Sequence, residues 1–227
     1  MEPVLAFLRD LKKKNNREWF QRQTERYQET KEVFTAFVED LLQRASAFDA
    51  TLQNLEASRC VFRIHRDIRF SKDKTPYKTH YGAFLSGAGK NSNGPGYYIH
   101  IEPGGKSMMA GGLYMPPTAD LVAIRERIAS EPKELRALLG NRALRKHFPD
   151  GMNGERSKVV RGYKPDHPAY DLLLVKNYIV WRHLSEEEVL SKALAKNVTA
   201  AFATLAPLND WLRRYKGPEK PRDPLAD

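Results

Sequence analysis

The chain opens with two amphipathic segments whose apolar residues recur at helical spacing. The first is short, with Val4, Phe7, Leu8 and Leu11 on one face. Asn16 then fits the N-cap of a second, longer helix. The broad apolar stripe of that helix comprises Trp19, Phe20, Tyr27, Phe34, Phe37, Leu41 and Leu42. The pattern therefore predicts a short helix followed by a long one.

From Ser58 the apolar period changes from 3.6 to 2, which is typical of a strand. Arg66 breaks the alternation, which indicates a bulge or a strand end near it. Four apolar residues share one parity and four polar residues the other: Phe62, Ile64, Ile68 and Phe70 against Arg63, His65, Asp67 and Arg69. The pattern predicts a strand over residues 62–70 with the apolar side chains buried.

Further strands are predicted at Tyr81–Leu85, Tyr97–Glu102, Ser107–Tyr114 and Tyr178–Trp181. Short spacers rich in Gly and Pro separate the first three, which favours antiparallel hairpins, and Pro103–Gly105 is the clearest turn. In the third of these segments, the pair Gly111 and Gly112 predicts a close approach of two backbones.

Helices are predicted over residues 118–129, 130–140 and 168–176, with a loop over 149–168. Ser185 and Glu188 form a capping box that begins the last helix. Strands gathered between N-terminal and C-terminal helices predict an α+β fold with a central, mainly antiparallel sheet. We expect a single domain over residues 1–215 and a flexible tail over 216–227, which carries three prolines.

Composition narrows the class of protein. With 227 residues, 41% of them hydrophobic, the chain suits a soluble globular protein. No apolar run approaches the roughly 18 residues of a membrane span, and the first residues do not resemble a targeting segment. Cys60 is the sole cysteine, which excludes an internal disulfide. We therefore expect a cytoplasmic protein without a membrane partner.

The net charge of +10 is unevenly distributed. Residues 58–117 carry nine Lys/Arg and three Asp/Glu, and residues 118–184 carry thirteen and eight. The two ends of the chain are close to neutral, so the excess lies in the middle. Such a surplus suits phosphorylated metabolites, nucleic acids or other anionic partners.

The segment Arg63–His80 concentrates this charge, with six Lys/Arg and two Asp. We predict that it binds a small anionic, phosphate-bearing ligand, since guanidinium and ammonium groups recognise such anions. The predicted ligand-binding residues are Arg63, Arg66, Arg69 and Lys74, with Asp67 orienting the arginines. The predicted groups for hydrogen bonding or proton transfer are His65, Tyr77 and His80. The alternative is a non-catalytic scaffold in which the arginines and aspartates form a structural network.

Other residues extend or compete with this hypothesis. Arg161, in a second basic segment, could complete the site from across a groove. A nucleic-acid-binding protein remains an alternative, because tyrosines near the cations could stack on bases. His65, His80 and the pair His100 and Glu102 raise the question of a metal. No dense metal-binding spacing is present and arginines nearby disfavour a cation, so no metal ligand is predicted. The sequence leaves cofactors, oligomeric state and any reaction open.

The chain also resembles a known family. Its main motif comprises Arg63, Arg66, Asp67, Arg69 and Phe70, followed by Asp73, Lys74, Tyr77 and His80. Residues 16–20, 112–116 and 162–168 extend the likeness over nearly the whole chain. These motifs resemble the bacterial and fungal family called domain of unknown function 2461. The resemblance implies a single mixed α/β domain of about this length, and it supplies no reaction, cofactor or catalytic residue.

Overall fold

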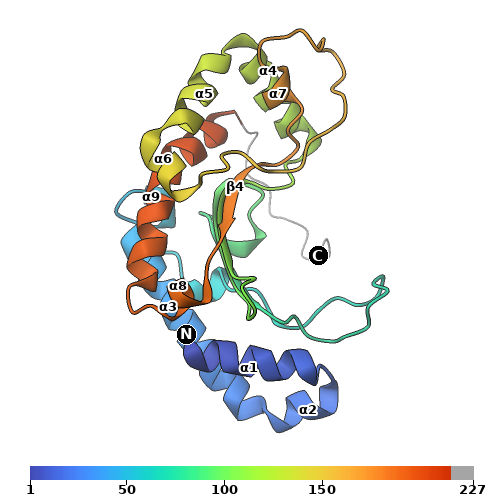
Figure 1. The fold of residues 1–227 in the computed structure, drawn as a ribbon, viewed down its shortest axis with the longest axis vertical. Coiled ribbons are helices and arrows are strands. Elements are labelled where there is room, and N and C mark those ends of the chain that lie inside the picture. Colours follow the sequence, from blue (N-terminus) through green and yellow to red (C-terminus); the bar gives the residue numbers. More distant parts are fainter. Residues whose placement is uncertain (216–227) are drawn as a thin grey trace.

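The structure of the protein is a computed structural model, and it describes residues 1–215 (Figure 1). The short first helix is α1 (Glu2–Lys13), and the predicted long one is divided at Gln23 into α2 (Arg17–Arg22) and α3 (Thr24–Ala45). The side chain of Asn16 caps α2 by accepting the Trp19 N–H, as predicted. The tail predicted for residues 216–227 lies outside the described residues.

Four strands form one antiparallel sheet in the order β1-β2-β3-β4. They are β1 (Tyr81–Leu85), β2 (Gly96–Ile101), β3 (Met108–Leu113) and β4 (Tyr178–His183). The predicted turn at Pro103–Gly105 joins β2 to β3, with both glycines at positive φ. At Gly112, a Cβ atom would lie 2.1 Å from the Tyr178 carbonyl oxygen on the neighbouring strand, so the predicted close approach is confirmed.

The remaining helices follow β3 and β4. They are α4 (Thr118–Ser130), α5 (Pro132–Gly140), α6 (Arg142–His147), α7 (Tyr170–Leu173), α8 (Glu186–Leu190) and α9 (Leu194–Arg214). Short 3-10 turns occur at Ala50–Leu52, Ala57–Arg59 and Gly89–Asn91. Ser185 and Glu188 form the predicted capping box, although the helix that they begin ends at Leu190 and α9 starts separately.

One face of the sheet lies in the core. Its residues alternate along each strand, and those facing inward, such as Tyr97, Ile99 and Ile101, are fully buried. Helices α3 and α9 pack on this face, and the Leu205 side chain approaches Gly111. Figure 1 shows both helices on one side of the sheet; on the other side, none of the α-helices within residues 1–215 covers it. The molecule is a single-domain α+β fold, as predicted.

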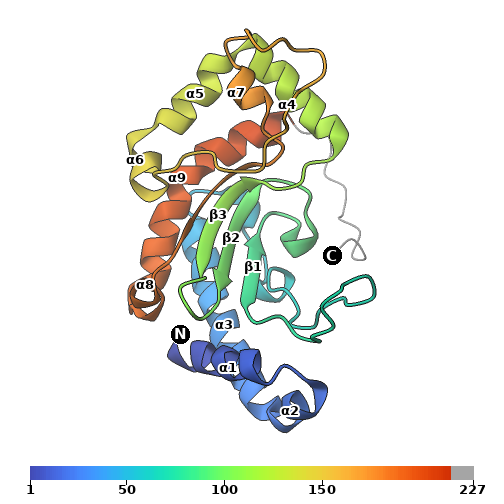
Figure 2. The same cartoon turned by 45° about the vertical axis from the view of Figure 1, so that its right-hand side comes forward.

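The strand predicted over residues 62–70 is wrong. Of these residues only the first pairs with the sheet: the Phe62 N–H donates to the Gly82 carbonyl of β1, an edge strand. The chain then projects as a narrow hairpin, residues 62–80, which we call the arm (Figure 2). Its two sides are joined by a bridge between His65 and Tyr77. Phe70, predicted to be buried, lies in the distal part of the arm and is 95% exposed.

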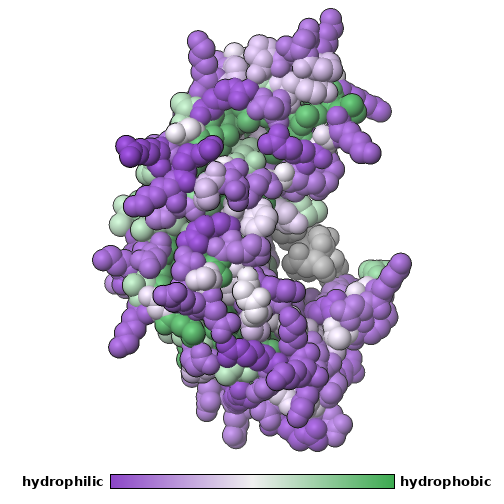
Figure 3. Space-filling view, in the orientation of Figure 1, coloured by the Kyte–Doolittle hydropathy of each residue, from purple (hydrophilic) through white to green (hydrophobic). Residues whose placement is uncertain are grey.

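A hollow lies between the arm, the uncovered face of the sheet and the segment α4–α7 (Figure 3). Cys60 lies two residues before the arm; its side chain is fully buried and its carbonyl accepts the Phe84 N–H. Among residues 1–215, no helix has the length and apolar character that a bilayer crossing requires.

Candidate functional site: the open face of the sheet

The floor of the hollow is a row of aromatic and imidazole side chains. The strand register places Tyr98 between Phe84 and Ala110, and His100 between Gly82 and Met108. On β4, Trp181 and His183 continue these two rows. Paired residues of antiparallel strands share a face, so all of these side chains lie opposite the buried core. The open face is therefore amphipathic, with polar groups available to a ligand.

Two residues of β2 and the residue that follows it form a hydrogen-bonded chain along this face. Tyr98, His100 and Glu102 alternate in sequence, and period 2 places them side by side. The His100 Nε2 lies 3.0 Å from Glu102 Oε2 and its Nδ1 lies 3.1 Å from the Tyr98 hydroxyl. Because a carboxylate only accepts, Nε2 carries the ring proton and Nδ1 accepts from Tyr98. The chain can hold or pass a proton between the phenol and the carboxylate.

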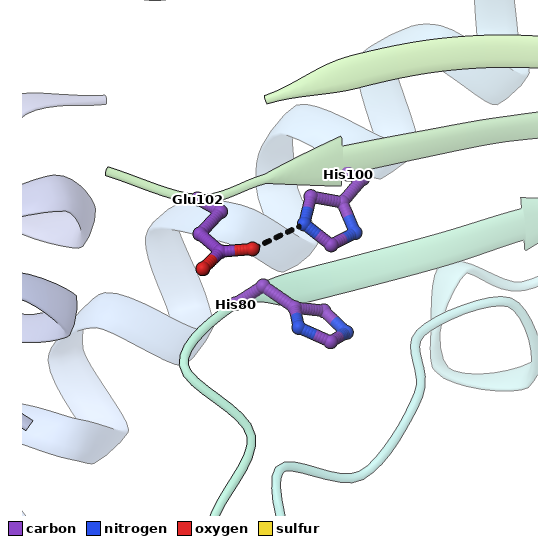
Figure 4. A group of neighbouring side chains, drawn as sticks. All are labelled: His80, His100 and Glu102. Carbon is purple, nitrogen blue, oxygen red and sulfur yellow. Dashed lines mark hydrogen bonds and ion pairs between the residues drawn. The ribbon is translucent and has the colours of Figure 1, made fainter. Parts of the chain in front are cut away.

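His80 joins this group from the arm. Its ring stacks on that of His100 with centroids 4.1 Å apart (Figure 4). Each of His80, His100 and Glu102 offers one ligand atom, and these atoms lie within 4.8 Å of one another. Burial, helped by the positive charge that His100 and Lys78 can carry, lowers the pKa of His80 to about 3. Burial also lowers the pKa of His100, against the opposing effect of Glu102. Both imidazoles are therefore neutral near pH 7.

Glu102 has two further partners. Its Oε1 atom accepts from the Thr79 hydroxyl at 3.2 Å and lies 3.9 Å from the Lys12 ammonium. The carboxylate is thus held by the arm on one side and by α1 on the other. Sequence reasoning had paired His100 with Glu102 but missed Tyr98, although the alternation from Tyr98 to Glu102 was the available signal.

The base of the arm is clamped by the turn between α1 and α2. The Asn15 side chain donates to the Tyr77 carbonyl at 2.8 Å and accepts the Tyr77 N–H at 3.1 Å. The Tyr77 ring stacks on Phe20 at 3.9 Å, and the exposed His65 packs edge-on against both rings. The buried Tyr77 and its neighbour His65 therefore lie beside α2. Nothing in the spacing of Asn15 indicated this clamp.

Two of the predicted anion-binding arginines pair with carboxylates of the arm itself. Arg66 binds the Asp73 carboxylate and the Thr75 hydroxyl, and Arg69 binds Asp67 at 2.6 Å. Hydrogen bonds from the Arg69 side chain and backbone N–H lower the pKa of Asp67 to about 2. These contacts join residues two to nine positions apart, so they shape the distal arm. Asp67 thus pairs with one arginine, Arg69, and its predicted role in orienting the arginines toward a ligand stays a prediction.

Three other cations of the arm form no ion pair within the described residues, although the charge of Arg63 acts on Asp67 at longer range. Arg63, Lys72 and Lys74 are exposed, and in the part of the chain that the structure describes none of them forms an ion pair. The Lys74 ammonium donates only to the Ile68 carbonyl, at 2.9 Å. These three groups are the arm's available positive charge.

The second basic segment lies across the hollow. Arg161 is exposed in the loop over residues 149–168, which runs beside α4 and α7 (Figures 1 and 2). The arm projects on the other side of the hollow. The structure therefore does not bring Arg161 into one cluster with the arm, and a bound molecule would have to span the hollow to touch both.

A further cavity of about 440 Å³ lies away from the hollow, between α3 and the segment 46–58. The charged residues that line it are Glu39 and Glu56. Two carboxylates disfavour an anionic ligand, so this cavity does not suit the chemistry predicted for the arm.

Comparison with known proteins gives one result. No curated protein and no solved structure matches the chain. The family described as "Conserved hypothetical protein (DUF2461)" matches residues 3–211, which includes the arm, the sheet and nearly all of α9. The chain therefore belongs to that family, in agreement with the motifs of the arm.

Proposed function

We propose that the protein binds an anionic, phosphate-bearing ligand in the hollow. The observation that carries this proposal is the set of exposed cations Arg63, Lys72 and Lys74 on the arm, none of which forms an ion pair within residues 1–215. Guanidinium and ammonium groups bind phosphate oxygens by charge-assisted hydrogen bonds. The remainder of the ligand would lie on the aromatic floor of the sheet, where Tyr98 and Trp181 offer flat apolar surfaces.

The paired arginines have a different part in this proposal. Arg66 and Arg69 hold the shape of the arm through Asp73 and Asp67, and so position the three exposed cations. His80 is too weak a base to take a proton at neutral pH, because its pKa is about 3. We therefore assign it contact with the ligand. The exposed His65 remains the predicted base if a proton transfer follows binding.

Titration with inorganic phosphate and pyrophosphate, followed by amide NMR shifts, tests the proposal. We expect the shifts to concentrate in residues 62–80 and on β2. Replacing Arg63, Lys72 or Lys74 by Ala should weaken binding about three- to tenfold for each cation removed. A double variant with Lys133→Ala and Arg142→Ala removes exposed cations of α5 and α6 and should leave affinity unchanged. If the control variant weakens phosphate binding as much as the arm variants do, or if no amide NMR shifts occur in the arm, the arm is not the binding site. The arm would then have a structural role.

Nucleic acid is a second candidate because of one contact. Phe70 is 95% exposed, and the Arg69 guanidinium lies 5.9 Å from its ring centre. An exposed ring beside a cation can stack on an unpaired base. Fluorescence anisotropy with a single-stranded oligonucleotide should then show affinity that falls steeply with salt and about fivefold or more in Phe70→Ala. No binding at low salt excludes this candidate.

A further inference from the structure

The cluster of His80, His100 and Glu102 offers a donor set that the arm's cations do not use. Two imidazole nitrogens and one carboxylate oxygen converge within 4.8 Å, on the floor of the hollow. We propose that these three residues bind a divalent transition-metal ion such as Zn²⁺. The proposal does not depend on the anionic ligand, since it concerns only side chains of the sheet and of the arm's base.

The separations suit one shared ion after small rotations of the side chains. With metal–ligand bonds of about 2.0–2.2 Å, neighbouring ligands of a tetrahedral ion lie about 3.4 Å apart. The His100 and Glu102 atoms are already 3.0 Å apart. The His80 ring must turn out of its stack on His100. It can do so because His80 and its neighbour Thr79 lie in the arm, before β1 begins at Tyr81. Three protein ligands would leave a coordination position open toward the hollow.

Surrounding groups complete the site as outer ligands do in metalloproteins. Binding at Nε2 of His100 moves the ring proton to Nδ1, and the Tyr98 oxygen then accepts instead of donating. The imidazole stays neutral throughout, so no other proton has to be supplied or removed. Thr79 continues to donate to the free oxygen of Glu102.

The cations nearby, apart from Lys78, are paired with carboxylates or can move away from an ion at this place. The nearest arginines in sequence, Arg66 and Arg69, are neutralised by Asp73 and Asp67 in the distal arm. Lys12 lies 3.9 Å from Glu102, at the limit of an ion pair, and its side chain is 47% exposed. It can therefore turn into solvent. Lys78 is the cation that acts against the ion, since its charge reaches His80, although its ammonium lies over the Phe62 ring, 5.5 Å from its centre.

Metal binding can be measured directly on the whole protein. Protein freed of metal with a chelator is titrated with Zn²⁺ by calorimetry and with Co²⁺ by visible absorption, which reports coordination number. We expect one equivalent of each ion and the strong absorption of four- or five-coordinate Co²⁺. Glu102→Gln keeps the shape of the side chain and should weaken binding by about 100-fold or more, as should His80→Ala. Tyr98→Phe, which removes an outer partner, should weaken it about 10-fold.

His147→Ala is the control, because His147 belongs to α6 and lies outside the cluster. It should leave affinity and spectrum unchanged. Absence of stoichiometric binding, a weak six-coordinate spectrum, or equal affinity in Glu102→Gln overturns the proposal. The circular dichroism spectra of His80→Ala and Glu102→Gln, compared with that of the wild type, show whether either variant has lost its fold. The two substitutions lie in different segments, so a folding defect in one leaves the other as a test. Phosphate binding measured with a chelator present separates failure of the metal site from failure of the proposed function.

Discussion

At the scale of the residue, Asp49 shows how the fold holds a buried charge. Its side chain is 1% exposed and lies before the 3-10 turn Ala50–Leu52. Thr51 donates to it at 2.6 Å and Tyr97 at 3.0 Å, while Arg213 of α9 forms an ion pair with it. Burial alone would raise the pKa of Asp49, but the hydrogen bonds from Thr51 and Arg213 outweigh it and lower the pKa.

Asp49→Asn should lower the free energy of unfolding at pH 7 by about 2–3 kcal/mol, because Arg213 loses its buried counter-charge. Because the pKa of Asp49 is lower in the folded than in the unfolded protein, its contribution to stability decreases at low pH. The stabilisation is complete above the unfolded value of about 3.9 and is lost as pH falls through the folded value. Urea unfolding between pH 7 and pH 3 should therefore show the difference between wild type and variant shrinking below about pH 4.

Asp210→Asn is the control, since Asp210 pairs with the same arginine from an exposed position. It should cost less than about 1 kcal/mol at any pH. A cost equal to that of Asp49→Asn would show that burial of the carboxylate has no special weight.

At the scale of the element, regular apolar patterns predicted helices and strands. They did not predict where side chains bind the backbone and so interrupt a helix or a strand. The bounds predicted for β1 agree with the structure, because its residues pair with β2 over the whole length. Residues 62–70 alternate, yet Asp67 accepts the Arg69 N–H and Asp73 accepts the Thr75 N–H. Such local bonds compete with a strand ladder. Ser191 likewise accepts the Ala193 N–H, between α8 and α9, where a single helix was predicted.

Gly112→Ala tests the contact between β3 and β4. A Cβ atom there would lie 2.1 Å from the Tyr178 carbonyl oxygen, at a φ of 116°. We expect a loss of about 3 kcal/mol or more in urea unfolding, because the backbones must separate. Gly105→Ala is the control: its φ is +71°, but nothing lies within 4 Å. It should cost about 1–2 kcal/mol, and an equal loss in both variants would contradict the steric account.

Asn15→Ala tests the clamp on the arm. The Tyr77 N–H and carbonyl lose their partner, so the arm should leave α2 more often without unfolding of the sheet. Hydrogen exchange should become about tenfold faster at the base of the arm, near Tyr77 and Lys78, and remain unchanged on β2 and β3. Lys14→Ala, an exposed neighbour, should change neither. Unchanged exchange in Asn15→Ala would mean that ring stacking alone holds the arm.

At the scale of the whole molecule, the hollow is made from segments that are far apart in sequence. His100 and Glu102 were predictable as neighbours on one strand. The arm returns His80 to the same place through a hairpin whose path depends on Asn15 and Phe20, and no local pattern specifies that path. The basic segment with Arg161 comes from beyond α6 and forms the opposite side. Composition located the surplus charge, but only the fold separates paired from unpaired cations.

The buried thiol just before the arm gives the protein an internal reporter. Burial raises the pKa of Cys60 to about 11, so a thiol reagent meets almost no thiolate while the edge of the sheet is closed. As the sole cysteine, it yields a single modification whose rate measures how often residues 60–62 detach from β1. A bound ligand or metal that holds the arm against the sheet would lower the rate of Cys60 modification, so binding can be followed without introducing a label.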